Sequence, residues 1–479
     1  MAMGTQRARE KQEDLFYASE QAEAPGHPFY QQLNRVLEQA KFDAFCEQRC
    51  RTFYHSKLGR PSLAPGVYFR LLLIGFFEGI GSERGIAWRV ADSLSLRRFL
   101  DYGLNEATPD HVTISRTRRL LDEATHQAVF TFVLTEVARR GMLKGKTIGI
   151  DATTLEANAA MRSIVRRDTG ENYMEYLRRL AKEAGLEASD DELRRADRKR
   201  KNKASNDDWV NPHDPDAEVT KMKDGSTHFA YKAEQAVDLD SGAIVAITTH
   251  GGAVGDTTSA EETLPAAGLA VADQIDTPTA QGKYKVHEQG MCEVVTDKGY
   301  HSGPTLLSVR EMGVRSYVSV PKQQRRNWKN KAGEQAAVYA NRRRVEGERG
   351  KQLLRRRGEF LERPFAHQYE TGGLRRVHVR GCGNVAKRVL LQAAAFNLAL
   401  ILRSLTKAGT PRGLADLNIA LFCALWRLLA ALPPLPALVT RPVGQRSPIS
   451  RRNLHNVAKS QSHASTLGSC RKRGSDTGC

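Results

Sequence analysis

Two aspartates follow short runs of apolar and β-branched residues, and this arrangement can support metal-dependent chemistry. Asp151 closes the run 147–150, and Asp297 closes the run 293–296. Each run predicts a buried strand that ends on a carboxylate. Carboxylates at the ends of neighbouring strands can share hard divalent cations, which assist attack on phosphorus. The pair therefore predicts phosphodiester chemistry.

The composition points to a polyanionic partner. The chain of 479 residues has 73 Lys and Arg against 54 Asp and Glu, a formal net charge of +19. Such an excess favours nucleic acid first and an anionic membrane surface second. The seven cysteines are scattered without a CxxC pair, which argues against a zinc ribbon and is typical of a reducing cytoplasm.

Neither the N-terminus nor the apolar stretches predict export or membrane insertion. Residues 1–14 are charged and lack the apolar core of a signal peptide. The stretches 67–80 and 417–432 are too short or too charged to span a bilayer. Both predict core helices, so we expect a cytoplasmic protein without a membrane partner.

The N-terminal part of the chain predicts a helical domain over residues 28–142, after a flexible segment 1–27. Ser82 is expected to cap one helix, and Ser115 lies at the start of a long helix that runs to about Arg140. Several short helices with basic, polar starts are similar to a helix-turn-helix array. This region is therefore a candidate DNA-binding domain.

Residues 143–406 predict a mixed α/β sheet with helices on its faces. Besides the two strands that end on aspartates, residues 228–249 form an expected hairpin and 315–320 a further strand. The charged segment 163–210 predicts an insertion with one amphipathic helix and a basic run, 194–203, which either follows a phosphate backbone or is merely solvated. A helix over 407–432 and a disordered basic tail over 433–479 complete the expected organisation.

The ordered set of motifs resembles bacterial insertion-sequence transposases of the DDE type. The resemblance rests on the blocks 148–154, 296–300 and 361–365, on Gly-Arg-Pro-Ser-Leu at 59–63, and on Arg380-Gly381 before the apolar helix that contains Asn397. It covers about residues 28 to 405. It implies a ribonuclease H-like catalytic core behind an all-α N-terminal domain.

The same resemblance implies the reaction and the partners. Transposases of this type cut double-stranded DNA at the terminal inverted repeats of the element and join the ends to target DNA. They use two Mg²⁺ ions, for which Mn²⁺ substitutes. The resemblance also implies a homo-oligomer in the DNA complex, working on the bacterial nucleoid.

The third metal-binding carboxylate is expected on a helix after the last strand. Glu362 matches the family pattern in Leu-Glu-Arg-Pro-Phe, although Pro364 predicts a kink or a helix start there. The rival is Glu346, which matches Tyr-x-x-Arg-x-x-x-Glu, but the lysine expected seven residues later is Leu353. We favour Asp151, Asp297 and Glu362 as the catalytic metal ligands; Glu348 and Glu359 are weaker candidates.

Other residues are candidates for DNA contact. Lys298, Arg342 and Arg363 can bind phosphates, and Trp328 can stack on an unpaired base. His301 and His367 are further phosphate-binding candidates. For each of these residues an ordinary surface or core position is the competing interpretation.

Two other functions compete with transposition. An aspartyl-phosphate hydrolase would use Asp151 as its nucleophile, but that class expects a second aspartate where Thr153 stands. A decayed transposase that only binds DNA is the other alternative, which the irregular tail after Pro433 would suit.

Overall fold

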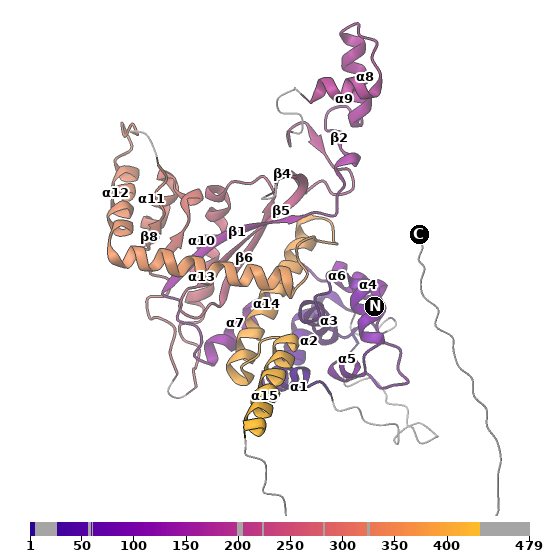
Figure 1. Cartoon of the computed structure of the whole chain (residues 1–479), viewed down its shortest axis with the longest axis vertical. Coiled ribbons are helices and arrows are strands. Elements are labelled where there is room, and N and C mark those ends of the chain that lie inside the picture. The colour runs from indigo at the N-terminus through magenta and orange to yellow at the C-terminus, as the bar shows by residue number, and fades with distance from the viewer. Residues whose placement is uncertain are drawn as a thin grey trace, which may run out of the picture. The chain divides into compact units, whose positions relative to one another are not determined.

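The computed structural model describes residues 1–4, 26–55, 59, 61–198, 205–222, 225–280, 283–322 and 326–431 (Figure 1). The predicted basic tail 433–479, most of the flexible segment 1–27 and residues 199–203 of the basic run lie outside these residues. The helices of four or more residues are α1 Pro28–Gln39, α2 Phe42–Cys50, α3 Pro65–Phe77, α4 Glu83–Ala91, α5 Leu94–Phe99, α6 His111–Leu120, α7 Glu123–Arg139, α8 Tyr173–Glu183, α9 Asp190–Asp197, α10 Asp256–Ala272, α11 Gly303–Glu311, α12 Ala332–Glu346, α13 Glu348–Glu370, α14 Cys382–Thr406 and α15 Pro411–Ala431.

The strands form one six-stranded mixed sheet and a small two-stranded one. The large sheet contains β1 Thr147–Glu156, β4 Glu218–Lys221, β5 Thr227–Asp238, β6 Ile244–Gly251, β7 Glu293–Thr296 and β8 Arg315–Val318, and the small one pairs β2 Val165–Arg166 with β3 Trp209–Val210. From one edge to the other, the large sheet runs β6-β5-β1-β7-β8, with β4 pairing the other end of β5. The strand β5 is antiparallel to β1 and β6, whereas β1, β7 and β8 are parallel. This mixed α/β architecture, preceded by helices, is consistent with the ribonuclease H-like core that the sequence predicted.

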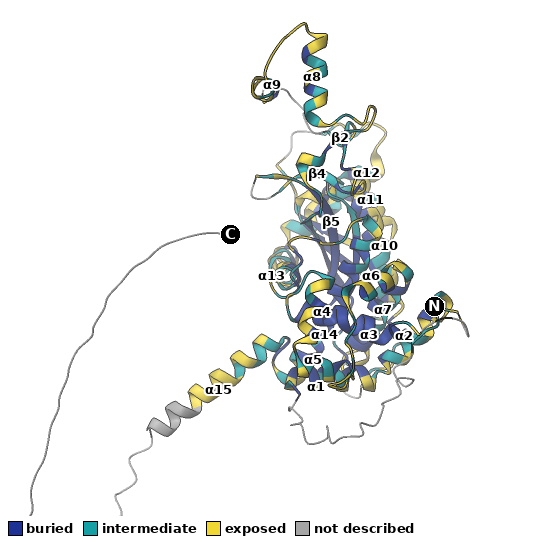
Figure 2. Ribbon diagram, turned by 90° about the vertical axis from the view of Figure 1, so that its right-hand side faces the viewer, coloured by how far each residue is buried: buried dark blue, intermediate teal, exposed yellow. Residues whose placement is uncertain are grey.

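Helices cover both faces of this sheet. Seen edge-on in Figure 2, α13 lies on one side of the strands, and α10 and α11 lie on the other. The residues of β5 from Phe229 to Asp238 are consequently buried on both faces, including the polar Lys232, Glu234 and Gln235. Polar side chains buried in this way need partners, and those partners belong to the candidate site described below.

Two asparagines close the open edges of the sheet. Asn397 of α14 accepts the N–H of Ile244 at 2.9 Å and donates to its carbonyl at 2.8 Å, so it pairs with the outer edge of β6. Asn341 of α12 does the same for Val318 of β8, at 2.9 and 2.8 Å. Both side chains are fully buried. An unpaired strand edge invites association with other chains, so these contacts protect the fold.

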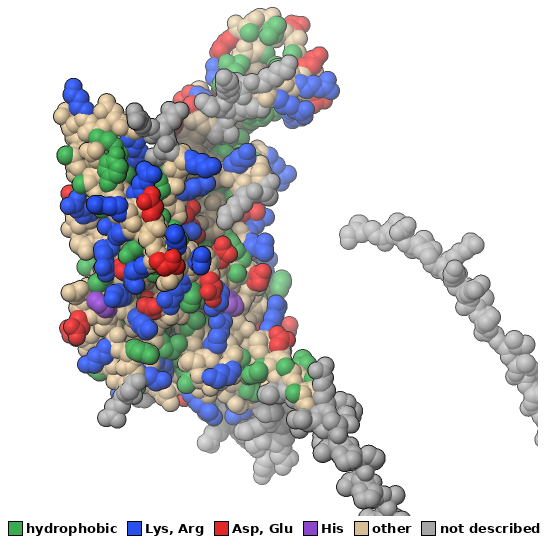
Figure 3. All heavy atoms as spheres, turned by 60° about the vertical axis from the view of Figure 1, so that its left-hand side comes forward, with side chains coloured by type: hydrophobic (Ala, Val, Ile, Leu, Met, Phe, Trp, Pro, Cys, Tyr) green, Lys and Arg blue, Asp and Glu red, His purple; other side chains and the backbone are tan. Residues whose placement is uncertain are grey.

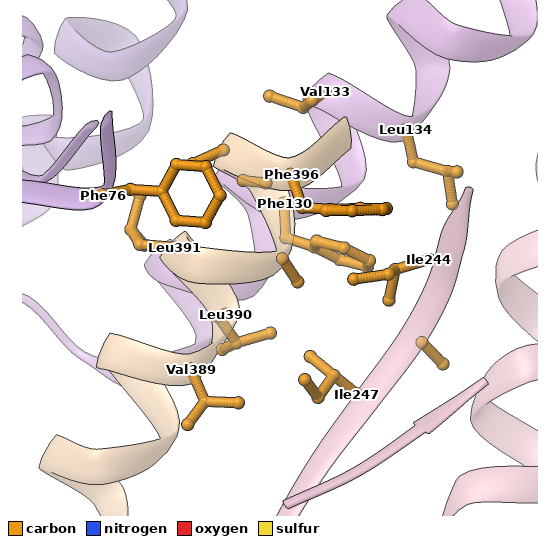
Figure 4. Close-up of a cluster of buried hydrophobic side chains, with 14 of the residues drawn as sticks. Phe76, Phe130, Val133, Leu134, Ile244, Ile247, Val389, Leu390, Leu391 and Phe396 are labelled. Carbon is orange, nitrogen blue, oxygen red and sulfur yellow. The ribbon is translucent and has the colours of Figure 1, made fainter. Parts of the chain in front are cut away.

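The N-terminal helices share their core with the sheet. Figure 4 shows Phe130 of α7, Phe76 of α3, Phe396 of α14 and Ile244 of β6 in one apolar cluster. The helix α14 thus lies between the helical domain and β6. The predicted domains 28–142 and 143–406 therefore pack together within one compact unit, which extends from Met1 to Cys423.

The structure corrects two predictions about where elements end. The strand β1 continues through Asp151 to Glu156, because residues 152–156 go on pairing with β5; Asp151 is thus inside a strand and does not end it. The long helix expected from Ser115 to Arg140 is two helices, α6 and α7. It breaks because Leu121 is extended and the Asp122 side chain caps α7 by accepting the Thr125 N–H.

Burial agrees with one of the two predicted core helices and contradicts the other. All residues of α3 are buried, which agrees with the expectation for 67–77, whereas residues 78–80 lie beyond the helix and are not buried. In α15, by contrast, Ile419 and Phe422 are 61% and 65% exposed, so the expectation of a core helix over 417–432 is wrong for its described residues. An apolar composition predicts that a helix can be buried. Whether other elements pack against that helix depends on the tertiary fold.

Among the described residues, one helical stretch, Cys382–Ala424, has the length and composition of a membrane span, but 72% of its most apolar 18-residue window is buried inside the protein. The core helix of a globular protein can have the same length and composition, and α14 is such a core helix.

The charged insertion contains α8, which matches the amphipathic helix expected there, and also α9 with a capping box at Ser189.

Candidate active site

The first feature of the site is that Asp151 and Asp297 lie at the same level on neighbouring strands. The parallel pairing of β1 with β7 aligns Gly149 with Val295, and Asp151 and Asp297 each follow two residues later. Side chains two residues apart on a strand point to the same face. The register therefore brings residues 151 and 297 to the same level of neighbouring strands, although they are 146 residues apart in sequence (297 − 151).

Each aspartate is oriented by a local hydrogen bond. Oδ1 of Asp151 accepts the N–H of Ala152 at 2.9 Å, and Oδ1 of Asp297 accepts the N–H of Gly299 at 2.8 Å. The latter bond caps the short 3₁₀ turn Lys298–Tyr300. Both aspartates are intermediate in exposure, so solvent reaches them while the backbone holds them.

The turn after Asp297 is held in place by a hydrogen bond of its last residue, Tyr300. Its hydroxyl donates to Oε1 of the fully buried Glu234 at 2.7 Å, and burial together with Glu234 raises the pKa of Tyr300 well above its usual range. The tyrosine therefore remains a hydrogen-bond donor at all working pH values. Because Tyr300 is three residues after Asp297, this bond fixes the loop that carries the carboxylate.

The anchor continues into a buried polar network on β5 and α10. Glu234 also accepts from the Ser259 hydroxyl at 2.6 Å, and Lys232 donates to that hydroxyl at 2.9 Å. Lys232, whose side chain is 6% exposed, forms an ion pair with Asp256 at 2.6 Å. Each buried charge thus has a polar partner, as buried charges require. Asp256 is the first residue of α10, and Gly255 is the N-cap of that helix.

A side chain at position 299 would disturb this arrangement. A Cβ on Gly299 would collide with Oδ2 of Asp256 and would lie 3.1 Å from Oδ1 of Asp297. The carboxylates of Asp256 and Asp297 therefore both border Gly299. Glycine is needed here to let the turn pass between them.

The helix α13 crosses the strands of the sheet (Figure 1) and packs against β1 and β7. Its Leu361 is fully buried over Gly149, where an added Cβ would lie 3.1 Å from Cδ1 of Leu361. One turn earlier, Nη2 of Arg357 donates to Oδ2 of Asp151 at 2.9 Å. This contact places a guanidinium directly at the candidate metal ligand.

The far end of α13 is fixed by a second buried carboxylate. Glu293, at the start of β7, is fully buried and accepts two hydrogen bonds from Arg349, at 2.6 and 3.1 Å, and one from Thr147 at 2.8 Å. Burial opposes ionisation, but the hydrogen bonds from Arg349 and Thr147 prevail and lower the pKa of Glu293. The clamp holds the start of α13 at the end of β7 opposite Asp297.

Glu362 is an exposed residue of α13, five residues after Arg357 and thus about 140° around the helix from the side chain that contacts Asp151. It lies seven residues, nearly two helical turns, before Tyr369, so the two share one side of the helix. The Tyr369 hydroxyl bonds to the Thr153 hydroxyl and approaches the Thr154 carbonyl, just beyond Asp151 on β1. The opposite flank faces the β5–β6 turn, where Arg356 pairs with Asp240 at 3.0 Å. The helix runs through Pro364 from Glu348 to Glu370, so the helix start that was one of the two expectations at that proline does not occur.

The rival, Glu346, lies at the other end of the strands. It is the last residue of α12 and pairs with Arg342 at 3.0 Å, both side chains being at least 60% exposed. Two residues before it, Arg344 donates to the Ser316 carbonyl near the start of β8. The end of α12 is therefore near the start of β8, whereas Asp297 follows the end of β7.

The candidate DNA-contact residues are dispersed. Lys298 is exposed directly after Asp297, and Arg363 is half exposed beside Glu362 and pairs with Glu359 at 2.9 Å. Trp328 is partly buried against Tyr339, at 6.2 Å between ring centroids, with the Arg326 guanidinium 5.8 Å from its ring. His301 is only 7% exposed, which leaves little of it for phosphate. His367 is partly buried and faces Thr371 and Arg403.

The candidates for holding a metal ion are thus Asp151 and Asp297 on neighbouring strands, and Glu362 on the exposed side of α13. Among the described residues, no group of three or more His, Cys, Asp or Glu side chains is close enough to hold an ion. The donor chemistry still suits Mg²⁺, which takes oxygen ligands and keeps several waters. In addition, one carboxylate oxygen of Asp151 contacts a cation, the Arg357 guanidinium.

Two features of the site were missed from the sequence. Arg357 belongs to the basic run 355–357, and its place four residues before Leu361 puts both on one helix face, a signal that was available. The buried network of Lys232, Glu234, Ser259 and Tyr300 had no such signal. The alternation along β5 is compatible with a solvated polar face.

Comparison with family models agrees with this architecture. The model described as Transposase domain (DUF772) matches residues 17–120, which cover most of the N-terminal helices, and the one described as Transposase DDE domain matches residues 207–398. The second match includes Asp297 and Glu362 but begins after Asp151. Comparison with curated proteins and with solved structures gave no match. The two family matches assign the chain to the insertion-sequence transposases of the DDE type.

Proposed function

We propose that this DNA transposase cuts the ends of its element and joins them to target DNA by metal-dependent hydrolysis and transesterification at Asp151, Asp297 and Glu362. The observation that carries the proposal is the β1–β7 register, which pairs Gly149 with Val295 and so brings residues 151 and 297 to one level of neighbouring strands. Two carboxylates at one level suit divalent ions, Mg²⁺ or Mn²⁺, which are expected as a pair. When bound, the ions would polarise the scissile phosphate and activate the attacking water or 3′-hydroxyl.

The residues of the chain have separate tasks in this mechanism. Asp151 and Asp297 hold the ions, and their backbone hydrogen bonds keep the carboxylate oxygens in place. Tyr300 fixes the Asp297 loop by its bond to Glu234. Lys298, exposed beside Asp297, is available to a phosphate of the bound strand.

Glu362 is the better third ligand for a geometric reason. It shares a side of α13 with Tyr369, which contacts β1 just beyond Asp151. Glu346 follows Arg344, which bonds to Ser316 near the start of β8. The contacts of Glu346 therefore favour a position away from the end of β7 where Asp297 is.

The helical domain suits binding of the DNA ends. Its helices α4 and α6 contact each other and carry exposed basic side chains at Arg84, Arg116 and Arg119. Trp88 on α4 is 65% exposed, an unusual position for a tryptophan in a protein without a partner. Figure 3 shows Lys and Arg spread over one face of the molecule, with acidic side chains among them. The proposed partners are the terminal inverted repeats and target DNA in the cytoplasm, bound by a homo-oligomer.

A cleavage assay tests the proposal and the choice of glutamate together. Purified protein is incubated with a DNA fragment that spans an element end, with Mg²⁺ or Mn²⁺, and nicks are mapped at the boundary. We expect Glu362→Gln to lower the cleavage rate by about 100-fold or more, and Glu346→Gln to change it by less than about threefold. The reverse pattern would move the third ligand to Glu346, and no cleavage by the wild-type protein would favour a decayed transposase that only binds DNA.

A further inference from the structure

The contact between Arg357 and Asp151 places a guanidinium at a proposed metal ligand. Nη2 of Arg357 lies 2.9 Å from Oδ2 of Asp151, with side chains 18% and 27% exposed. The Nε of Arg357 is buried and has no hydrogen-bond partner in the described chain. An arginine side chain with one N–H group engaged and another unpaired has capacity for a second acceptor.

A divalent ion and this guanidinium compete for the same carboxylate. Both are cations attracted to Oδ2 of Asp151, and a metal ion bound there would repel Arg357. The planar guanidinium matches phosphate oxygens as well as it matches a carboxylate, and it can bind either with two parallel hydrogen bonds. Arg357 therefore has a natural second partner whenever DNA and metal enter the site together.

We propose that Arg357 exchanges partners during the reaction: it pairs with Asp151 in the DNA-free protein and binds a phosphate of the scissile strand once a divalent ion occupies Asp151. This inference rests on the proposed metal-dependent function. It makes Arg357 a phosphate-binding catalytic residue, and its pairing with Asp151 weakens metal binding until DNA supplies the alternative partner.

The fixed position of α13 makes this exchange local. Arg349 is clamped to Glu293, and Leu361 is packed over Gly149, on either side of Arg357. The helix is thus held at two points eight residues before and four residues after Arg357. A change of side-chain rotamer is sufficient to move the guanidinium from Asp151 toward the open side of the site.

The chain offers a matched control in the preceding residue. Arg356 is also an arginine of α13 in an ion pair, but its partner is Asp240 at the β5–β6 turn, at 3.0 Å. Its side chain is 41% exposed. Removing Arg356 changes the net charge as much as removing Arg357 does, without touching a proposed metal ligand.

The test measures Mn²⁺ affinity of the DNA-free protein by electron paramagnetic resonance of the free ion, and DNA cleavage separately. We expect Arg357→Gln to bind Mn²⁺ about fivefold more tightly than wild type, since it loses a competing ion pair, while Arg356→Gln stays within about twofold. We expect the cleavage rate of Arg357→Gln to fall by about 100-fold, and that of Arg356→Gln to stay near wild type. Arg357→Lys keeps the charge but not the two parallel hydrogen bonds, so it should restore wild-type Mn²⁺ affinity and leave cleavage impaired.

Three outcomes would overturn the exchange. They are an unchanged Mn²⁺ affinity in Arg357→Gln, an equal gain in Arg356→Gln, or cleavage by Arg357→Gln at the wild-type rate. A thermal melt of each variant shows whether it is folded, and Arg357→Lys provides the same comparison if Arg357→Gln is not. None of these outcomes affects the metal-site assignment itself, which fails separately if Asp297 variants cleave normally.

Discussion

Removing one oxygen atom at Tyr300 should weaken both the fold and the metal site. The substitution Tyr300→Phe deletes the hydroxyl that donates to Glu234 at 2.7 Å and leaves the rest of the buried ring in place. Hydrogen bonds to charged groups contribute about 1.5–3 kcal/mol, so we expect the free energy of unfolding to fall by about 2 kcal/mol. No cavity larger than an oxygen atom forms, so packing loss adds little.

The functional effect follows from the position of Tyr300 in the turn after Asp297. With its anchor lost, the turn samples more positions, and the carboxylate is no longer held beside Asp151. Partners that orient a metal ligand commonly change metal affinity by about 10–100-fold. We expect Tyr300→Phe to weaken Mn²⁺ binding by about tenfold, measured by titration of the DNA-free protein alongside a urea unfolding curve.

Tyr317→Phe is the matched control. Tyr317 is also a buried tyrosine whose hydroxyl faces a buried glutamate, Glu293, but at 3.5 Å and on the strand beyond β7. Loss of the Tyr317 hydroxyl should lower the free energy of unfolding by less than about 1 kcal/mol and leave the Mn²⁺ affinity unchanged. If Tyr300→Phe binds Mn²⁺ as wild type does, or if both variants lose affinity equally, the anchoring role of Tyr300 is refuted.

Two further predictions concern packing and pH. Gly149→Ala adds a Cβ that would lie 2.7 Å from Leu239 and 3.1 Å from Leu361, so it should destabilise the protein by about 1–3 kcal/mol and slow cleavage by displacing α13. The control Gly358→Ala has open space around the added Cβ and should not destabilise the protein. Equal melting temperatures for the two variants would contradict this packing. Burial lowers the pKa of His126 from 6.5 to about 4. Between these two pH values the unfolded chain binds a proton at this histidine that the folded protein does not bind. The free energy of unfolding therefore decreases as the pH falls from 6.5 toward 4. Between pH 7 and pH 5 this loss amounts to about 2 kcal/mol in urea unfolding, and His126→Gln should remove it; an identical pH dependence in that variant would refute the assignment.

The sequence was sufficient for the parts of the site that depend on local pattern. The runs before Asp151 and Asp297 predicted two strands because β-branched residues favour a buried strand, and the family resemblance supplied the fold around them. The extension of β1 beyond Asp151 depends on pairing with β5, which is a long-range contact. No pattern within residues 147–156 reports that pairing.

The rest of the site depends on how elements pack across the sheet. The alternation along β5 does not reveal that helices cover both faces, so Lys232 and Glu234 gave no sign of a buried network. The side of α13 on which Glu362 lies can be assigned only from contacts such as Tyr369 with Thr153. Pro364 gave a wrong expectation of a helix start, because a proline in a long helix removes only one hydrogen-bond donor, and tertiary packing around the buried ring can compensate.

A metal-specificity switch at Asp297 tests the central claim most directly. Asp297→Cys replaces a hard oxygen ligand with sulfur, which Mg²⁺ binds poorly and Mn²⁺ accepts better. Cleavage of element-end DNA by this variant should be lost in Mg²⁺ and partly recovered in Mn²⁺, while Asp256→Cys, beside the same glycine, should show no such dependence on the ion. Equal loss in both ions, or full activity of Asp297→Cys in Mg²⁺, would contradict a metal site built on Asp151 and Asp297.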